Sequence, residues 1–275
     1  MRDRRAIGLF LSASLVTIAT VGSADAPVSG NHHMTRPSEP ASAQGVSVIS
    51  NTPSITPEQL LDRPQAEGRA LARLLLSLKP ASSFTNTGKL VIRAPKKKRS
   101  EVVYECRVLV TTTDWTSFYS ARIGTNILSR FSVRHSDASE NRYLDERGNT
   151  MTAAQIVASF AGSDFSMADL GLDFLRWPDQ RVVKWEMKRS FGCKVLESRN
   201  PGPVTGGYSK VISWIHEETN GLIQAEAYDA RGKLLKEFRP TETEKVDGRH
   251  ELKEMEIENV QTDTRTTLVF DLGNS

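Results

Sequence analysis

The chain has 275 residues, with 36 Lys and Arg against 33 Asp and Glu, and only two cysteines. Its formal net charge of +3 falls to +1 without the first 24 residues, which carry three arginines and one aspartate. A mature chain so close to neutrality argues against nucleic-acid binding, which needs a concentrated basic surface. The length suits one β-rich domain, because β-barrels routinely run to ~200–250 residues.

Residues 1–24 have the pattern of a signal peptide. Three arginines within the first five residues precede an uncharged apolar stretch, residues 6–22, and small residues follow at Gly22-Ser23-Ala24. We therefore expect export and cleavage near Ala24. The apolar stretch is at the lower limit for a membrane span, so an uncleaved anchor is the alternative interpretation. No cysteine lies near the cleavage point, so we do not expect the chain itself to be a lipoprotein.

The mature chain divides by composition into a leader and a domain. Residues 25–55 are rich in Ser, Pro, Ala, Thr and Asn without periodicity, which predicts a flexible leader. Residues 56–275 are expected to form a single domain. Thr56 and Pro57 form a helix start, which Pro64 should interrupt. Beyond it, the i, i+3, i+4, i+7 spacing of four leucines predicts an apolar helical face that ends before Pro80: Leu71, Leu74, Leu75 and Leu78.

From Lys89 onward the pattern changes to β-strands. Short apolar and aromatic segments predict strands at residues 90–92, 102–104, 108–110, 115–119, 126–133 and 141–144. A basic run, Lys96-Lys97-Lys98-Arg99, lies in the loop expected between the first two strands. Such a run is typical of a solvated turn, and attraction to an anionic membrane surface is the second interpretation.

Three tight turns organise the strands that follow. Asp145–Gly148 and Asp229–Gly232 both place Asp first and Gly last, and Asn220-Gly221 is a strong hairpin signal. These turns predict an antiparallel meander. A parallel α/β sheet would need helices between its strands, and none fit in the C-terminal half. The predicted fold class is therefore mainly β with a few helices.

Two short helices are expected between the strands. Thr152 and Gln155 form a capping box for a helix over residues 153–160, and Ser166 and Asp169 form another for residues 167–175. Gly171 weakens the second helix by ~1 kcal/mol. A weak apolar helix between strands fits a movable lid and fits equally well a helix that covers the core.

The sequence offers little that resembles a catalytic or metal site. It contains no phosphate-binding glycine loop, nucleophile elbow or metal-spaced His/Cys set, so we predict no catalytic residue, no cofactor and no metal. Glu254, Glu256 and Glu258 share one face of a predicted strand and are interpreted as solvated surface. A weaker alternative is an exported hydrolase that uses His216 or this glutamate row.

The two cysteines, Cys106 and Cys193, both fall in predicted strands. An exported protein meets oxidising conditions, so a disulfide between them is one interpretation. Two buried thiols that behave as small apolar side chains are the other.

Several segments resemble one known family. They are Gly162-Ser163-Asp164-Phe165-Ser166 with Asp169-Leu170, then Gly192–Glu197, Tyr208–Ile215 and Ala225–Leu234. In order and spacing they are similar to outer-membrane lipoprotein-sorting proteins, a LolA-like group of exported proteins. The resemblance covers roughly residues 85–272. It implies a half-open antiparallel β-barrel covered by helices, with an apolar cavity for lipid in place of a catalytic centre.

Aromatic, Met and Leu side chains in the predicted strands and lid are the candidate cavity residues. On pattern alone they are ordinary core, whereas in a half-open barrel they would line a groove for acyl chains. The set comprises Phe165, Leu170, Phe174, Leu175, Trp177, Trp185, Met187, Trp214, Met255 and Phe270.

The resemblance implies a periplasmic carrier that shields the acyl chains of lipoproteins or other lipids on their way to the outer membrane. Opening of residues 165–177 would expose the cavity. An inner-membrane transporter and an outer-membrane acceptor are the partners that the resemblance implies, and no nucleic acid is expected. The alternative is a lipid-sensing periplasmic adaptor or regulator on the same fold, without cargo transport.

Overall fold

The computed structural model describes residues 57–96, 98–136, 140–246 and 249–272. The predicted signal peptide, the leader and the predicted domain start at Thr56 lie outside these residues. The described residues from Arg63 onward belong to one compact unit, and residues 57–62 belong to a second. In the described part, no helix combines the length and the apolar character needed to cross a membrane.

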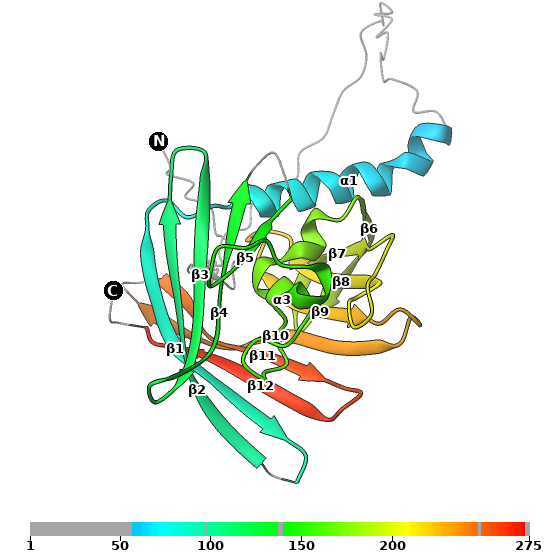
Figure 1. Cartoon of the computed structure of the whole chain (residues 1–275). Coiled ribbons are helices and arrows are strands. Elements are labelled where there is room, and N and C mark those ends of the chain that lie inside the picture. Colours follow the sequence, from blue (N-terminus) through cyan, green and yellow to red (C-terminus); the bar gives the residue numbers. More distant parts are fainter. Residues whose placement is uncertain (1–56, 97, 137–139, 247–248, 273–275) are drawn as a thin grey trace, which may run out of the picture. The chain divides into compact units, whose positions relative to one another are not determined.

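Twelve antiparallel strands form one open sheet (Figure 1). Their order is β5-β4-β3-β2-β1-β12-β11-β10-β9-β8-β7-β6, so β5 and β6 are the two edges, and no pairing joins them in the described residues. The predicted mainly β, half-open antiparallel architecture is confirmed. The strands are β1 Phe84–Ala94, β2 Lys98–Val110, β3 Asp114–Ile123, β4 Asn126–Ser136, β5 Arg142–Asp145, β6 Asp179–Lys188, β7 Phe191–Arg199, β8 Lys210–His216, β9 Leu222–Tyr228, β10 Leu234–Val246, β11 Arg249–Asn259 and β12 Thr264–Phe270.

Local turn chemistry sets this meander. The Oδ1 atom of Asp145 accepts hydrogen bonds from the backbone N–H groups of Arg147 and Asn149. Asp229 makes the same pair of contacts with Arg231 and Lys233. Each turn thus has an Asp that bonds its own backbone, with a glycine at positive φ in the fourth place. The two aspartate turns predicted from the sequence are therefore confirmed. The predicted Asn220-Gly221 turn is also present, in the connection between the antiparallel strands β8 and β9, with Asn220 at φ 57°.

Strands β2 and β3 bury alternate residues on the face that we call the inner face. On β2 these are Val102, Tyr104, Cys106 and Val108, with exposed residues between them. Strand β3 buries Trp115, Ser117, Tyr119 and Ala121 in the same way. This period of two follows from the pleat of a strand. The inner face carries the main hydrophobic core, and the opposite face is called the outer face.

Helix α1, Pro57–Ser77, is a long amphipathic helix, and its residues from Arg63 onward lie across the sheet of the compact unit (Figure 1). Leu71, Leu75 and Leu78 are buried in the main core, but Leu74 of the predicted stripe is 44% exposed. A Cβ atom at Gly68 would overlap the backbone of Arg181, so the helix approaches β6 closely at that glycine. The predicted interruption at Pro64 was wrong, because the helix runs through that residue. A proline inside a helix removes one backbone hydrogen bond, and packing of the following turns compensates.

The two edge strands are connected by short helices. These are α2, Ala153–Ile156, α3, Met167–Gly171, and the 3-10 helix η1, Asp173–Arg176. Both predicted capping boxes are present, at Thr152–Gln155 and Ser166–Asp169. The helices are shorter than predicted. The second one breaks because Leu172 adopts a left-handed conformation, with φ 54°, between α3 and η1.

The two cysteines are free buried thiols, so the disulfide interpretation was wrong. Cys106 lies in the main core, whereas Cys193 lies in a second small cluster with Val195 and Trp214. Burial raises the pKa of the Cys106 thiol to about 12, which makes it inert as a nucleophile.

Candidate functional site

The segment between the edge strands fills the inner face of the sheet. We call residues 159–177 the plug. Its apolar side chains are buried in the same cluster as the inner-face residues, and the sheet curves around it in Figure 1. The edge strands β5 and β6 do not pair to close the barrel in the described residues, and the plug fills its interior instead. The buried apolar plug residues are Phe160, Phe165, Leu170, Leu172, Phe174 and Leu175.

Aromatic rings dominate the contact between plug and sheet. The Phe160 ring meets Phe131 edge-on, with centroids 5.5 Å apart, and makes similar contacts with Tyr119 at 6.4 Å and Tyr104 at 6.5 Å. Tyr104 also meets Phe270 of β12 at 6.4 Å. Edge-to-face pairs of this kind add about 0.5–1.5 kcal/mol each beyond area burial. The hydroxyl of Tyr119 donates to the carbonyl of Leu170 at 3.0 Å, which adds a polar contact to the plug.

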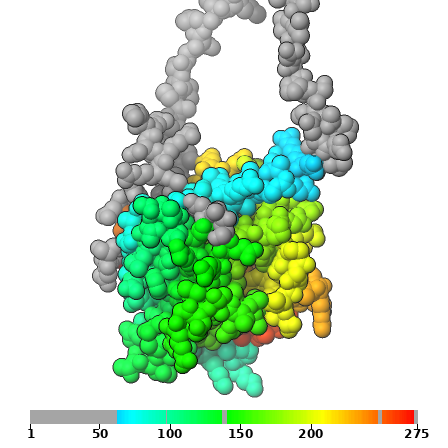
Figure 2. All heavy atoms as spheres, turned by 45° about the horizontal axis from the view of Figure 1, so that its top comes forward, coloured from blue at the N-terminus to red at the C-terminus, as the bar shows by residue number. Residues whose placement is uncertain are grey.

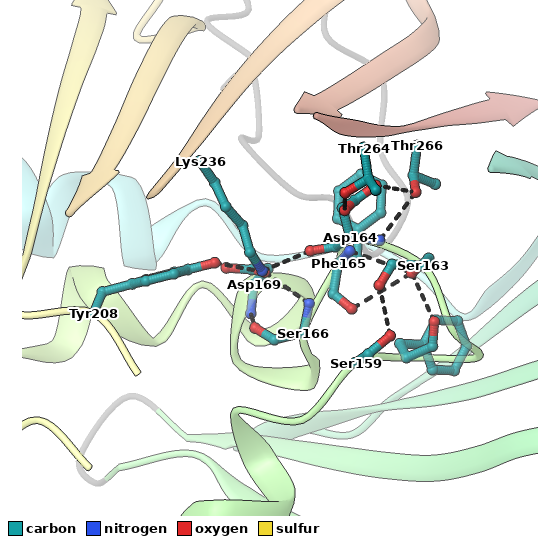
Figure 3. A network of polar contacts seen from close by, with 11 residues as sticks. Ser159, Ser163, Asp164, Phe165, Ser166, Asp169, Tyr208, Lys236, Thr264 and Thr266 are labelled. Atoms are coloured by element: carbon teal, nitrogen blue, oxygen red, sulfur yellow. Dashed lines mark hydrogen bonds and ion pairs between the residues drawn. The ribbon is translucent and has the colours of Figure 1, made fainter. Parts of the chain in front are cut away.

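A polar network attaches the plug to the last strand (Figure 3). The carboxylate of Asp164 accepts from Thr264 Oγ1 at 2.5 Å and from Thr266 Oγ1 at 2.8 Å. The backbone N–H of Asp164 donates to Thr266 Oγ1 at 3.0 Å. Lys236 of β10 donates to the carbonyl of Asp164 at 2.6 Å. We call these contacts, together with those of Asp169 below, the first latch.

Asp169 is the second carboxylate of the first latch and is 1% exposed. Its Oδ2 atom accepts from the backbone N–H of Ser166 at 2.7 Å and from the hydroxyl of Tyr208 at 3.0 Å. The ammonium of Lys236 lies 3.6 Å from the same oxygen (Figure 3). A buried charge is tolerated only when it is paired and hydrogen-bonded, so these partners keep α3 in place.

Serine hydroxyls shape the turn that leads into the first latch. Ser163 Oγ donates to the carbonyl of Phe160 at 2.6 Å and accepts from the N–H of Phe165 at 3.2 Å. Ser159 Oγ donates to the carbonyl of Ser163 at 2.5 Å. Gly162 has φ 73°, a conformation that glycine adopts without strain. The Gly-Ser-Asp-Phe-Ser motif thus forms a tight turn, buries Phe165 in the core and bonds the Asp164 carboxylate to β12.

A second polar cluster, the second latch, holds the other side of the plug against β4 and β5. The Asp173 carboxylate accepts from the Tyr143 hydroxyl at 2.6 Å and from the Asn141 amide at 2.7 Å. That amide also donates to the carbonyl of Gly171 at 2.9 Å. Burial raises the pKa of the Asp173 carboxyl above its ordinary value. A Cβ atom at Gly171 would overlap the Tyr143 hydroxyl, so only glycine allows this close approach.

Asn141 connects the second latch to a buried histidine. Its Oδ1 atom lies 2.9 Å from His135 Nδ1, and His135 Nε2 lies 3.3 Å from Ser117 Oγ. The His135 ring stacks on Trp115, with centroids 4.8 Å apart. Burial lowers the pKa of His135 to about 4, so the ring is neutral near pH 7. The contact between His135 and Ser117 resembles that of a catalytic base with a hydroxyl. The two side chains are 2% and 0% exposed, so a substrate has no access to them in this conformation.

The structure brings seven of the ten candidate cavity residues together. Phe165, Leu170, Phe174 and Leu175 of the plug are buried against Met255 and Phe270 of the sheet, and Trp177 packs partly buried on the same cluster.

The other three candidates lie elsewhere. Trp185 and Met187, near the end of β6, are 55% and 58% exposed. The Trp185 indole donates to Glu217 at 2.9 Å. Trp214 belongs to the small second cluster, away from the main core, and its indole donates to Glu186 at 2.5 Å. A role of these three residues in ligand binding is therefore not supported by their placement.

Sequence reasoning missed several residues, on the plug and on the sheet, that form the contact between the two. Phe160, Tyr104, Tyr119 and Phe131 make the aromatic contacts, and Tyr143 with Asp173 makes the second latch. The strict alternation of apolar residues along β2 could have identified Tyr104 as inward-facing. The pairing of Tyr143 with Asp173 had no sequence signal, because the two residues are separated by the whole α2–α3 connection.

The residues considered for catalysis have structural partners. His216 Nδ1 lies 2.8 Å from Thr219 Oγ1, and its ring meets Phe191 edge-on. Glu256 is buried at 7% exposure and pairs with Arg239 and Arg265, so the expectation of a fully solvated glutamate row was wrong for this residue. Within the described ranges, no group of three His, Cys, Asp or Glu side chains could hold a metal ion.

A family model with the description "Uncharacterized protein" matches residues 120–272, which is more than half of the chain. The chain belongs to this family. No curated protein matches the sequence.

Several solved structures are similar, and three of them have TM-scores above 0.5 over most of the chain. A DUF1329 family protein from Desulfovibrio piger has a TM-score of 0.62 at 19% identity over 77% of this chain and 95% of its own. A Vibrio parahaemolyticus domain, provisionally described as outer membrane lipoprotein-sorting, has a TM-score of 0.61 at 17% identity, with the same two coverages. A LolA superfamily protein from Nitrosomonas europaea has a TM-score of 0.53 at 14% identity over 76% and 91%. At these identities the comparison shows the fold, so the resemblance to LolA-like proteins is confirmed at that level.

Proposed function

We propose that the protein is a periplasmic lipid carrier that holds acyl chains on the inner face of the sheet when the plug moves aside. The observation that carries this proposal is the way the barrel is filled. The strands at the open edges do not pair in the described residues, and the apolar inner face is covered by the plug together with buried side chains of α1. A segment attached at its sides by polar latches can leave and return without rearranging the strands.

Measured from water, burial of the plug and burial of an acyl chain on the inner face contribute comparable free energies. The six buried apolar side chains of the plug contribute roughly 12 kcal/mol, at about 2 kcal/mol each. An acyl chain of about sixteen carbons contributes a similar amount, at about 0.8 kcal/mol per buried methylene. One chain can therefore replace the plug at little net cost, which suits a carrier that must also release its cargo. When the plug moves aside, the polar groups of the latches form hydrogen bonds with water in place of those they lose. The latches therefore orient the closed plug but add little to the free energy of opening it.

The same proposal includes export and delivery. The signal peptide would be cleaved near Ala24, the cargo would be the acyl chains of lipoproteins or other lipids, and transfer would proceed towards the outer membrane. An inner-membrane transporter would supply the cargo and an outer-membrane acceptor would receive it. The LolA-like fold and the apolar inner face support this sequence of events.

The test uses signal-cleaved protein purified from the periplasm without detergent. Native mass spectrometry is expected to find a co-purified acylated molecule, which the protein then delivers to vesicles of phosphatidylethanolamine and phosphatidylglycerol. An apo mass that also resists added lipid would contradict the proposal. Lipid that binds but never reaches the vesicles would contradict transport and favour a lipid-sensing regulator on the same fold.

A further inference from the structure

A groove lies between α1 and the end of the plug. It has a volume of about 410 Å³, within the range of ~300–1,000 Å³ typical of small-ligand sites. Figure 2 shows the cyan residues of α1 lying on the green and yellow part of the molecule. Its wall on the plug side comes from residues 175–177, and its wall on the α1 side comes from Arg69, Ala72, Arg73 and Leu76.

Three guanidinium groups line the groove. Arg69 and Arg73 are four residues apart on α1, so both project from the same helical face. Both are exposed, and in the described part of the chain neither makes an ion pair. Arg176 of the plug adds a third positive charge, and its Nη1 atom donates to the carbonyl of Ser136 at 3.0 Å, which fixes the side chain. Glu140 is the acidic residue of the lining, so the charge of the groove is positive.

The floor of the groove is apolar and belongs to the plug. Leu175 lines the groove and is also buried in the main core, and Trp177 packs on that core. A ligand in the groove would therefore have its charged end among the arginines and its apolar part directed towards the plug. Arginine binds phosphate and carboxylate groups through two parallel hydrogen bonds, which gives geometric selectivity for such anions.

We propose that this groove binds an anionic group, a phosphate or a carboxylate, through Arg69, Arg73 and Arg176. The anion site follows from these residues alone. Its assignment to the head group of an acyl lipid, whose chain displaces the plug, rests on the proposed function. The protein then prefers anionic amphiphiles, and binding of the head group beside Trp177 favours opening of the plug.

Calorimetric titration with three probes tests the inference: palmitoyl lysophosphatidylglycerol, palmitoyl lysophosphatidylcholine and inorganic phosphate, each in low and high salt. The variant is Arg69→Gln with Arg73→Gln, at exposed positions of a helix that tolerates Gln. The matched control is Arg130→Gln with Arg231→Gln, which removes the same charge at exposed positions outside the groove. Circular dichroism and melting temperature confirm that both variants fold.

We expect the anionic lysolipid to bind at least tenfold more weakly to the groove variant than to the control. High salt should weaken its binding to the control by a similar factor. Lysophosphatidylcholine, whose head group is zwitterionic, should bind the groove variant and the control with the same affinity. Binding of phosphate alone, abolished by the variant, with no binding of either lysolipid would support the anion site while removing the proposed lipid function. Equal binding of both lysolipids, unaffected by the variant, would overturn the inference and leave the lipid function standing. Failure of every probe to depend on the two arginines would overturn it as well.

Discussion

Asp164 and Thr266 bind each other through two hydrogen bonds across 102 residues of sequence. The backbone N–H of Asp164 donates to the threonine hydroxyl, which in turn donates to the Asp164 carboxylate. One hydroxyl thus satisfies both the backbone and the side chain of the plug at the point where it meets β12. The next residue, Thr267, is also buried but makes no side-chain hydrogen bond in the described part of the chain.

The first prediction concerns this contact. Thr266→Val keeps the volume of the side chain but removes both hydrogen bonds, one of which is to a carboxylate and contributes about 1.5–3 kcal/mol. Hydrogen–deuterium exchange of residues 159–177 should accelerate about tenfold or more, while the strands keep their protection. Thr267→Val is the control and should leave exchange of the plug unchanged. Equal exchange in both variants would show that the first latch does not hold the plug.

A second prediction concerns Gly171. A methyl group at this position would overlap the Tyr143 hydroxyl, which is held by Asp173. Gly171→Ala should therefore destabilise the protein by about 1–3 kcal/mol through overpacking, although alanine favours a helix. Thermal unfolding measures the effect. Gly202→Ala, at a site with open space around the new methyl group, should change stability by no more than ~0.5 kcal/mol. A stabilising effect of Gly171→Ala would contradict the close approach described here.

The third prediction is a pH dependence that originates at His135. Its pKa is about 4 in the folded protein against an ordinary value of 6.5. The unfolded chain therefore binds the proton more readily between these values, and stability falls as the pH drops from 6.5 to 4, by about 3 kcal/mol. Asp173 acts in the opposite direction, because burial raises its pKa and the folded state holds its proton longer.

Urea unfolding across this pH range checks the third prediction. His135→Gln should flatten the decline between pH 6.5 and 4, whatever its effect on stability at pH 7. His216→Gln should retain the decline, because His216 lies outside the main core. If the free energy of unfolding falls equally with pH in the unmodified protein and in His135→Gln, other groups cause the acid sensitivity.

A fourth prediction separates the two faces of the sheet. Phe270→Leu shortens a side chain on the inner face and should weaken binding of a palmitoyl lipid by about 1 kcal/mol, or roughly fivefold. Trp214→Phe changes the second cluster and should leave lipid affinity unaltered. Fluorescence titration with a labelled lysolipid gives both values. A greater loss in Trp214→Phe than in Phe270→Leu would place the ligand on the outer face.

The sequence predicts what local chemistry determines. The capping boxes at Thr152 and Ser166 and the aspartate turns depend on residues within four positions of each other, and all are present. The position of Trp214 could not be predicted in the same way. Strand β8 is buried on both faces, with Val211 in the main core and Trp214 in the second cluster, so its pattern does not identify the inner face.

Trp185 illustrates a different limit. A register irregularity between Val182 and Lys184 inserts one extra residue into β6, and such a bulge changes which side chains face inward beyond it. The alternation expected from the sequence is therefore lost just before Trp185. The latches also escaped prediction, since contacts such as Tyr208 with Asp169 or Tyr143 with Asp173 depend on the tertiary path of the plug.

Photo-crosslinking with a palmitoyl lipid that carries a diazirine near the end of its chain tests most directly whether acyl chains replace the plug. After irradiation, mass spectrometry identifies the labelled peptides. We predict labels on the inner face, at strands β2, β3 and β12 around Tyr104, Tyr119 and Phe270, together with faster exchange of residues 159–177. Labels confined to Trp185, Met187 or Trp214, with the plug still protected, would contradict an acyl-binding inner face.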